Sequence, residues 1–426
     1  MAGNRYLSMK DNSNIKIRLM LLSFLQFAVW GAYLTSMGRY LGSVGLGEWI
    51  GWFYAVLGIV SIFMPATMGI IADRWVPAQK LLSFCHAASA LLLSAVAYVG
   101  NIKGTQVAFN DIFWFYAAGV AFYMPTLALS NSVSYTSLRR AGLDTVKAFP
   151  PIRVFGTVGF IVSMWIVDLL GFQGNCNQFY TSAVWGVLLA LYSLTMPACP
   201  VSGANGQKSF ASALRLDAFK LFAQRRMALF FLFAMLLGGA LQISNGYANN
   251  FIASFSRYPV YDGTFAVEHT NIIISLSQIS ETLCILLIPF FLGRFGIKRV
   301  ILIAMLAWVL RFAFFGLGNP GSGVWLFVLS MLVYGVAFDF FNISGSLFVD
   351  KEVPENMRSS AQGLFILMTN GLGASIGVIA AQEVVNKFAT SPEGWSTAWY
   401  IFAAYAFVVS VLFALFFKDN RTQTTK

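Results

Sequence analysis

Long apolar segments recur along the whole chain, and each is about as long as a helix that crosses a lipid bilayer. The hydrocarbon core offers no hydrogen-bond partner to a backbone, so segments of this length are expected to be helical. Charged residues make up 11% of the chain, against about 25% in soluble proteins. The sequence therefore predicts an all-α membrane protein with twelve transmembrane helices. The expected spans are residues 15–42, 48–72, 81–100, 108–130, 152–172, 179–197, 227–255, 269–292, 299–318, 324–349, 359–384 and 396–417.

The longest hydrophilic stretch, from about Val201 to Arg226, divides the spans six and six. Leu25-Gln26 in span one and Leu241-Gln242 in span seven match between the halves, and basic loops follow spans two and eight. Two six-helix halves in parallel repeat predict the major facilitator fold. Within the loop, Ser209 to Phe222 is expected to form a short amphipathic helix on the membrane surface. The expected parts are an extension 1–14, halves 15–197 and 227–417, a central loop 198–226 and a tail 418–426.

The Lys and Arg residues predict the orientation of the spans in the membrane. One side holds Arg39, Lys103, Arg257 and Lys387, Arg153 and Arg311 lie within spans, and all others of the 28 fall on the side of the amino terminus. Loops rich in Lys and Arg stay in the cytoplasm, so both termini are expected there. The net charge of +11 is spread over short loops and not gathered in a basic domain. We therefore expect a lipid bilayer around the protein and no nucleic-acid partner.

Span ten carries a carboxylate near its middle. A charge at that depth costs at least about 2.5 kcal/mol on insertion scales, so an acid found there indicates a functional site. At roughly 100° per residue, one arc of about 140° holds Tyr334, Gly335, Phe338, Asp339 and Asn342. We interpret this polar, aromatic face as the wall of a cavity. The alternative is a structural Asp339 that is hydrogen-bonded to a neighbouring helix.

Span eight adds Gln278 and Glu281, which are three residues apart and therefore share one helix face. With Asp339, the carboxy-terminal half then buries two acids. Acids that face one cavity repel each other and lose hydration, so they can hold protons, and proton coupling is our interpretation. A fixed hydrogen bond between Glu281 and a helix backbone is the alternative.

Span seven carries Gln242 and Asn245, again three residues apart, among Gly238, Gly239 and Gly246. Uncharged amides offer both donors and acceptors, which suits a neutral ligand rich in hydroxyl and amide groups. Hydrogen bonding between helices is the alternative use of either amide.

Span five presents Arg153, Thr157 and Phe160 within about 60° of one another. Arg153 lies one turn inside the cytoplasmic end, where it could pair with a carboxylate during transport or extend to the membrane interface. Arg311, in the middle of span nine, has no acid on its own helix and no assigned partner.

Several stretches resemble the nucleoside:proton symporter family of the major facilitator superfamily, and the likeness covers about residues 14 to 418. They are Asn14-Ile15-Lys16-Ile17-Arg18, Phe149-Pro150-Pro151-Ile152-Arg153, Ser275–Leu283, Tyr334–Val349 and Ser360-Ala361-Gln362-Gly363. The resemblance implies import of nucleosides, uridine or adenosine among them, into a bacterial cytoplasm by a proton-driven carrier of the inner membrane. We also expect alternating access, no cofactor, no metal and a monomer.

The family's site pattern falls on Arg153, Thr157, Phe160, Gln242, Asn245, Gln278, Glu281, Tyr334, Phe338 and Asp339. In family terms the amides and acids bind ribose hydroxyls and base edges, and the aromatic rings stack on the base. Asp339 and Glu281 are then expected to link protonation to binding. These are the positions that spacing and the cost of burial had already indicated.

Other functions are less consistent with the residues. A sugar:proton symporter would also use a buried acid and an Arg, but it would depend less on stacking rings. An exporter of hydrophobic drugs would have fewer amides in its pocket. A membrane enzyme would need a catalytic set in its loops, which are short and hold no Ser/His/Asp set, metal cluster or glycine-rich phosphate loop. We therefore expect a transporter and not an enzyme.

Overall fold

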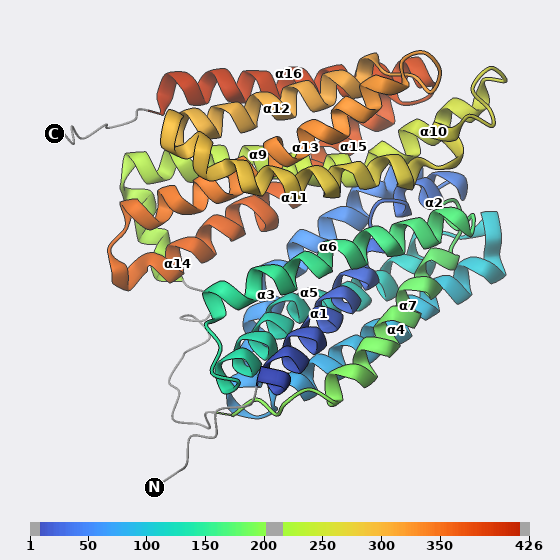
Figure 1. The fold of residues 1–426 in the computed structure, drawn as a ribbon. Coiled ribbons are helices and arrows are strands. Elements are labelled where there is room, and N and C mark those ends of the chain that lie inside the picture. The colour runs from blue at the N-terminus through green and yellow to red at the C-terminus, as the bar shows by residue number, and fades with distance from the viewer. Residues whose placement is uncertain (1–8, 202–215, 418–426) are drawn as a thin grey trace, which may run out of the picture. The chain divides into compact units, whose positions relative to one another are not determined.

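In the computed structural model, which describes residues 9–201 and 216–417, the chain folds into helices, with no strand in those ranges (Figure 1). The long helices are α1 (Met9–Gly31), α3 (Ile50–Arg74), α4 (Ala78–Lys103), α5 (Phe109–Arg140), α6 (Thr145–Leu169), α7 (Asn177–Leu194), α9 (Arg225–Ser254), α11 (Thr270–Phe295), α12 (Ile297–Leu317), α13 (Val324–Glu352), α15 (Ala374–Phe388) and α16 (Pro392–Phe416). Shorter elements are α2 (Met37–Ser43), α10 (Phe265–Glu268), α14 (Glu355–Ile366), the π-helical turn η5 (Leu367–Gly373) and the 3₁₀ turns η1 (Gly47–Trp49), η2 (Gly104–Gln106), η3 (Leu216–Ala223) and η4 (Phe255–Arg257).

Within the described ranges, ten helical stretches are long and apolar enough to cross a membrane. The predicted all-α membrane class is confirmed, and a helix lies at each predicted span. Two spans differ in detail. Span one breaks after Gly31, and the chain turns before it resumes as α2 at Met37. Span eleven is made of α14, η5 and α15, with a π-helical turn in its middle.

Three sequence expectations fall partly or wholly outside the described residues. Residues 1–8 of the extension 1–14 and all of the tail 418–426 lie outside them. Of the expected amphipathic helix, Ser209 to Arg215 lies outside, and the remainder falls in η3, which is a 3₁₀ turn and not an α-helix.

Contacts divide the chain into two compact units. The first is residues 1–49 and 59–214, and the second is Ile50–Gly58 with Arg215–Lys426. The start of α3 therefore belongs to the second unit, where the Gly51 N–H donates to Gln382 and the Ser375 hydroxyl donates to the Ala55 carbonyl at 2.9 Å. The halves 15–197 and 227–417 stay a prediction.

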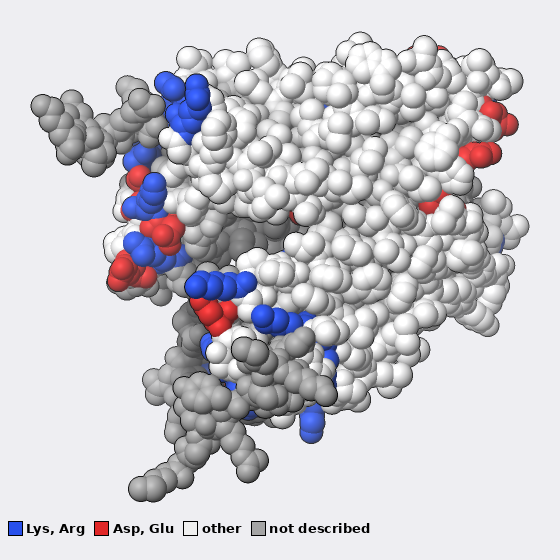
Figure 2. Space-filling model, viewed as in Figure 1, with Lys and Arg blue, Asp and Glu red and all other residues white. Residues whose placement is uncertain are grey.

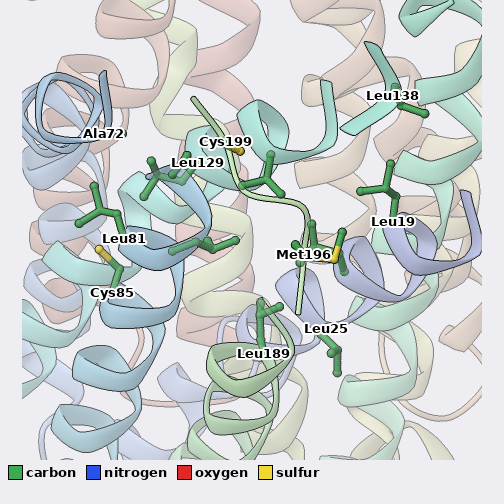
Figure 3. Packing of buried hydrophobic residues seen from close by; sticks show 14 of the residues in the cluster. Leu19, Leu25, Ala72, Leu81, Cys85, Leu129, Leu138, Leu189, Met196 and Cys199 are labelled. Carbon is green, nitrogen blue, oxygen red and sulfur yellow. The ribbon is translucent and has the colours of Figure 1, made fainter. Parts of the chain in front are cut away.

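The first unit has an apolar core that several of its helices share. Figure 3 shows part of this core, with Leu19 and Leu25 from α1, Ala72 from α3, Leu81 and Cys85 from α4, Leu129 and Leu138 from α5, Leu189 from α7, and Met196 and Cys199 beyond it. Helices α1 and α6 approach closely because glycines face them. A Cβ on Gly159 would collide with the Phe24 carbonyl, and one on Gly31 would collide with the Phe160 carbonyl.

The second unit uses the same device between α9 and the broken helix of span eleven. A Cβ on Gly239 would lie 2.7 Å from the Cα of Gly377, and one on Gly238 would collide with the Thr369 carbonyl of η5. Such close backbones replace side-chain packing between membrane helices, where lipid tails are as apolar as Leu.

Charged side chains gather at the helix ends of each unit, and the visible helix flanks are mostly uncharged (Figure 2). In the first unit, Arg18 donates to the Thr195 carbonyl and Arg140 to the Ala198 carbonyl. In the second, Arg226 pairs with Glu352 at 2.6 Å. This distribution is what a membrane-spanning bundle requires.

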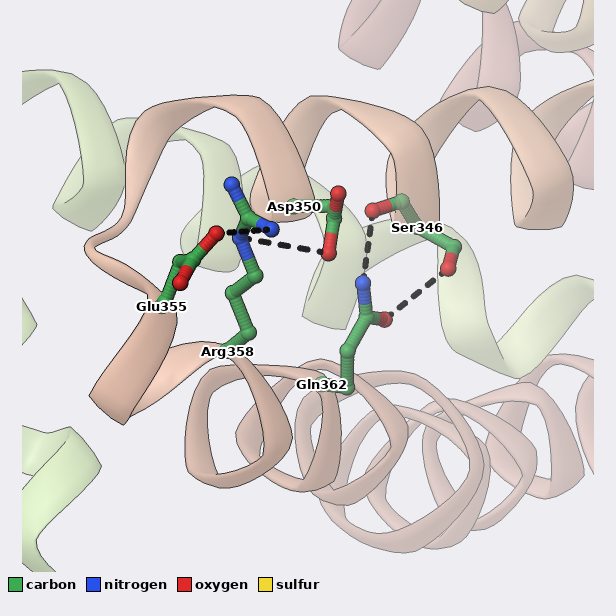
Figure 4. Close-up of polar contacts among 5 residues, drawn as sticks. All are labelled: Ser346, Asp350, Glu355, Arg358 and Gln362. Atoms are coloured by element: carbon green, nitrogen blue, oxygen red, sulfur yellow. Dashed lines mark hydrogen bonds and ion pairs between the residues drawn. The ribbon is translucent and has the colours of Figure 1, made fainter.

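The end of α13 is fastened to α14 by polar contacts (Figure 4). The Gln362 amide donates to the Ser346 carbonyl at 2.7 Å, and the Ser346 hydroxyl donates back to Gln362 at 2.9 Å. Arg358 lies 3.6 Å from Asp350 and 3.7 Å from Glu355. These contacts fix the turn that leads into the π-helical element.

Candidate functional site

Two aromatic rings form the centre of the candidate site in the second unit. Tyr334 and Phe338 stand one turn apart on α13 and stack with a centroid distance of 5.6 Å and an interplanar angle of 5°. Trp308 of α12 meets the edge of Tyr334 at 6.0 Å and 89°. Tyr334 is buried, and Phe338 is half-buried. The two side chains thus form one aromatic stack, in which Phe338 is the more exposed ring.

Hydrogen bonds set the register of α11 against α13. The Ser277 hydroxyl donates to the Met331 sulfur at 3.0 Å, and the Ser280 hydroxyl donates to the Leu332 carbonyl. Gly335 allows this approach, because a Cβ there would lie 2.5 Å from the Ser280 carbonyl oxygen. The polar residues of α11 are thereby held beside the aromatic stack.

Gln278 and the two acids lie around Tyr334. The Gln278 side chain lies near the Tyr334 hydroxyl, and Tyr334 is within electrostatic reach of both Glu281 and Asp339. Asp339 is 5% exposed, and Glu281 is half-buried. Because both acids lie near Tyr334, the charge of either acid acts on the same side chain.

Asn342, on the wall that the sequence suggested, makes a hydrogen bond within its own helix. Its amide donates to the Phe338 carbonyl at 2.8 Å, one turn back on α13. One of its two N–H donors is therefore used by its own helix, a bond that helical spacing alone does not reveal.

Helix α9 contributes the two amides that the sequence indicated. Gln242 is 7% exposed, and its Oε1 has no hydrogen-bond partner among the residues that the structure describes. Asn245 is half-buried. A buried amide oxygen without a donor is unusual and suits a ligand that brings one.

Arg311 of α12 joins this site, although the sequence gave it no role. It is 2% exposed, and its guanidinium donates to Ser244 of α9, which stands between Gln242 and Asn245. The same group lies 4.7 Å from the centroid of the Tyr334 ring. Its position in mid-span, without an acid on its helix, was the only signal in the sequence.

The remaining three candidates lie on α6 in the first unit. The Arg153 guanidinium lies over the Phe27 ring of α1, 3.8 Å from its centroid. Thr157 is half-buried, and Phe160 is 7% exposed with its carbonyl against Gly31. Arg153 thus packs on a ring of its own unit in this structure.

The second unit therefore brings together seven of the ten candidates, and the first unit carries the other three. The seven are Gln242, Asn245, Gln278, Glu281, Tyr334, Phe338 and Asp339, from α9, α11 and α13. The three are Arg153, Thr157 and Phe160. The seven residues of the second unit offer amide donors and acceptors, two acids and flat aromatic rings. Together they can bind a neutral, flat, hydroxylated molecule and a proton.

Comparison with known proteins gives a consistent result. The sequence profile of the family described as Nucleoside H+ symporter matches residues 13–422. Nucleoside permease NupG of Escherichia coli (strain K12) is 47% identical over 410 residues, which are 95% of this chain and 96% of the permease. Xanthosine permease of the same organism is 47% identical over 411 residues, with 96% and 97% covered. A crystal structure of nucleoside transporter NupG has a TM-score of 0.88 at 47% identity and covers 95% of this chain and 100% of that chain.

Proposed function

Because the chain belongs to the nucleoside H+ symporter family, we propose that it binds its nucleoside through the residues that α9, α11 and α13 present in the second unit. Arg153, Thr157 and Phe160 of α6 are the candidate substrate residues of the first unit. The protein is a proton-coupled nucleoside importer of the major facilitator fold, working by alternating access. The proposal concerns which side chains carry out each part of this activity.

The stack of Tyr334 on Phe338 is the observation that carries the proposal. A nucleobase is flat and aromatic, and offset stacking on such rings adds about 0.5–1.5 kcal/mol beyond burial. Gln278 lies near the Tyr334 hydroxyl, at the edge of the same stack. The base is expected to lie against the rings with its polar edge towards this amide.

The ribose is assigned to the amides of α9. The Gln242 oxygen is buried and has no donor within the described ranges, and a sugar hydroxyl supplies one. Asn245, three residues further along α9, can donate to or accept from a second hydroxyl. A neutral ligand fits this arrangement, because amides do not compensate a net charge.

Asp339 and Glu281 are assigned to the proton. When both acids are ionised, the two carboxylates repel each other and both have lost hydration. One of them therefore takes up a proton from the outside. Each proton that moves down 100 mV supplies about 2.3 kcal/mol. At one proton per nucleoside this sustains roughly fifty-fold accumulation.

Uptake of labelled uridine into proteoliposomes tests the proposal. The wild type is expected to accumulate uridine when an inward proton gradient is imposed. Asp339→Asn is expected to lose the stimulation by the gradient while it still exchanges or binds uridine. Stimulated uptake by Asp339→Asn would remove Asp339 from the coupling. Absence of uridine binding after replacement of a residue outside the site, such as Lys351→Gln, would show that loss of function is unspecific.

We also propose a place for the protein in the cell: a multi-pass carrier of the bacterial inner membrane, acting as a monomer with both termini in the cytoplasm. The bias of Lys and Arg towards one side of the spans supports this orientation.

A further inference from the structure

The Arg311 guanidinium is held by three other helices of the second unit. Its Nε and Nη2 donate to the Ser244 hydroxyl of α9 at 2.9 and 2.7 Å. Its Nη1 donates to the Ser330 carbonyl of α13 at 2.7 Å and to the Ser277 hydroxyl of α11 at 3.3 Å. In return, the Ser330 hydroxyl donates to the Arg311 carbonyl at 3.0 Å.

These partners are all uncharged. In the described part of the chain no carboxylate lies within ion-pair distance of Arg311, which is 2% exposed. A buried charge normally pairs with an opposite charge, since lost hydration is costly. Here hydroxyls, a carbonyl and aromatic rings stabilise it, with the ring centroid of Tyr334 at 4.7 Å and that of Phe315 at 5.4 Å.

Each partner of Arg311 adjoins a candidate substrate residue. Ser244 stands between the two amides of α9, and Ser277 precedes Gln278. Ser330 lies one helical turn before Tyr334, whose ring the guanidinium also covers. The planar fork of Arg can make all these contacts at once, whereas the single ammonium of Lys cannot.

We propose that Arg311 is a positioning residue for substrate selectivity: it fixes the Tyr334 ring in the stack with Phe338, and thereby selects nucleosides with an aromatic base. This inference rests on the proposed function. Arg311 does not touch the nucleoside in this scheme. It acts through Tyr334, by covering one face of the ring and by holding α9, α11 and α13 in register.

A purely structural role predicts something different. If Arg311 only joins helices, its loss lowers thermal stability and the amount of active carrier, but the surviving carrier keeps its preference among substrates. If Arg311 orients Tyr334, the preference itself changes. The ratio of affinities for two substrates that differ only in the base separates these roles, because the amount of active protein cancels.

The experiment compares uridine with 5,6-dihydrouridine as competitors of labelled uridine uptake by the purified full-length chain in proteoliposomes. Dihydrouridine keeps the ribose, but its base is saturated and not flat. Stacking on an aromatic side chain contributes enough for wild type to favour uridine by roughly tenfold or more. Arg311→Lys is expected to raise the KM for uridine by about tenfold and to bring the ratio near that of Tyr334→Leu, with kcat changing less.

Two serine variants complete the design. Ser244→Ala removes the acceptor of two guanidinium donors and is expected to lower the ratio in the same direction as Arg311→Lys. Ser330→Ala is the matched control: it deletes a buried hydrogen bond at the same junction, but the guanidinium keeps its bond to the Ser330 carbonyl. Its ratio is expected to equal that of wild type.

The outcomes separate the inference from the proposed function. If Tyr334→Leu lowers the ratio while Arg311→Lys and Ser244→Ala keep it, the positioning role is wrong and the proposed site stands. If wild type does not favour uridine, or Tyr334→Leu leaves the ratio unchanged, base stacking on the Tyr334–Phe338 pair is wrong and the proposed binding site fails. If Arg311→Lys does not fold, Ser244→Ala decides alone. In that case, adding Ser244→Ala to Tyr334→Leu must cause no further loss of selectivity, because both substitutions act through the same ring.

Discussion

At the scale of single residues, the buried His86 of α4 is held by a chain of hydrogen bonds whose directions can be assigned in turn. The Thr126 hydroxyl donates to the Tyr123 carbonyl, so it accepts from the Gln26 amide nitrogen at 2.8 Å. The Gln26 amide oxygen therefore faces His86 Nε2 at 2.9 Å, and this nitrogen must carry the hydrogen. This chain of hydrogen bonds joins α1, α4 and α5 in the core of the first unit.

This chain predicts a stability effect that a second substitution reverses in part. Gln26→Leu leaves the His86 donor buried without an acceptor, so we expect a loss of about 1–3 kcal/mol in the free energy of unfolding. Adding His86→Leu removes the stranded donor and is expected to recover part of the loss. Thermal melting of the purified variants, followed by the monodisperse fraction, measures both. A double variant that melts below the single one would contradict the assignment.

A second residue-scale prediction concerns the stacking face. Phe338→Leu keeps an apolar side chain of similar bulk but removes the flat ring from the Tyr334 stack. We expect the KM for uridine to rise by about five- to tenfold, since stacking contributes roughly 1 kcal/mol or more. The matched control is Phe340→Leu, on the same helix, where the ring contacts Phe291 at 5.0 Å. Equal KM values for the two variants would show that the ring of Phe338 has no special role.

At the scale of helices, glycines control how closely α1 and α6 approach. Gly159→Ala would force its new methyl group into the Phe24 carbonyl, and α6 would have to move outward. Arg153 and Phe160 would move with it, so we expect lower uptake together with lower thermal stability. Gly119→Ala is the control, because its Cβ would meet only ordinary contacts at 3.4–3.5 Å. It is expected to be neutral or slightly stabilising. A Gly159→Ala carrier with wild-type uptake would mean that the spacing of these helices is not important for transport.

The helices themselves were largely predictable, because length and hydropathy are properties of each segment alone. The break after Gly31 was not. Ala32, Tyr33 and Leu34 in the turn are buried and as apolar as the flanking helices. Thr35 and Ser36 follow, but small hydroxyl residues are common within membrane helices and do not mark a break. The π-helical turn of η5 was not predicted either. It packs closely against α9, where a Cβ on Gly373 would collide with the Met235 carbonyl oxygen, and a contact between helices cannot be read from the local sequence.

The candidate site shows the same limit. Helical spacing placed Gln278 with Glu281, and Tyr334 with Phe338, on shared faces. It could not give contacts between helices. The bonds from Arg311 reach Ser244, 67 residues earlier, and Ser330, 19 residues later. Small hydroxyl residues are common in membrane helices, so nothing in one sequence selects these two.

At the scale of the whole molecule, charge and topology are linked. In the second unit, Arg226 at the start of α9 pairs with Glu352 at the end of α13, and Lys298 at the start of α12 donates to the Ala414 carbonyl of α16. These helix ends therefore lie at one end of the unit. Arg257 donates to the Thr390 carbonyl where α9 ends, which is the opposite end. The richly basic end is expected to face the cytoplasm.

Thiol labelling of whole cells can test this orientation, because the four natural cysteines are buried and unpaired and should react little. Asp262→Cys places an exposed thiol beyond the Arg257 end, and Lys351→Cys places one at the basic end. A maleimide that cannot cross the inner membrane is expected to label Asp262→Cys in intact cells. It should label Lys351→Cys only after the membrane is opened. If the Arg257 end faced the cytoplasm, the basic loops of the other end would have to cross the bilayer, and membrane insertion opposes this. Labelling of Lys351→Cys in intact cells would therefore reverse the assigned topology and, with it, the side from which Asp339 takes its proton.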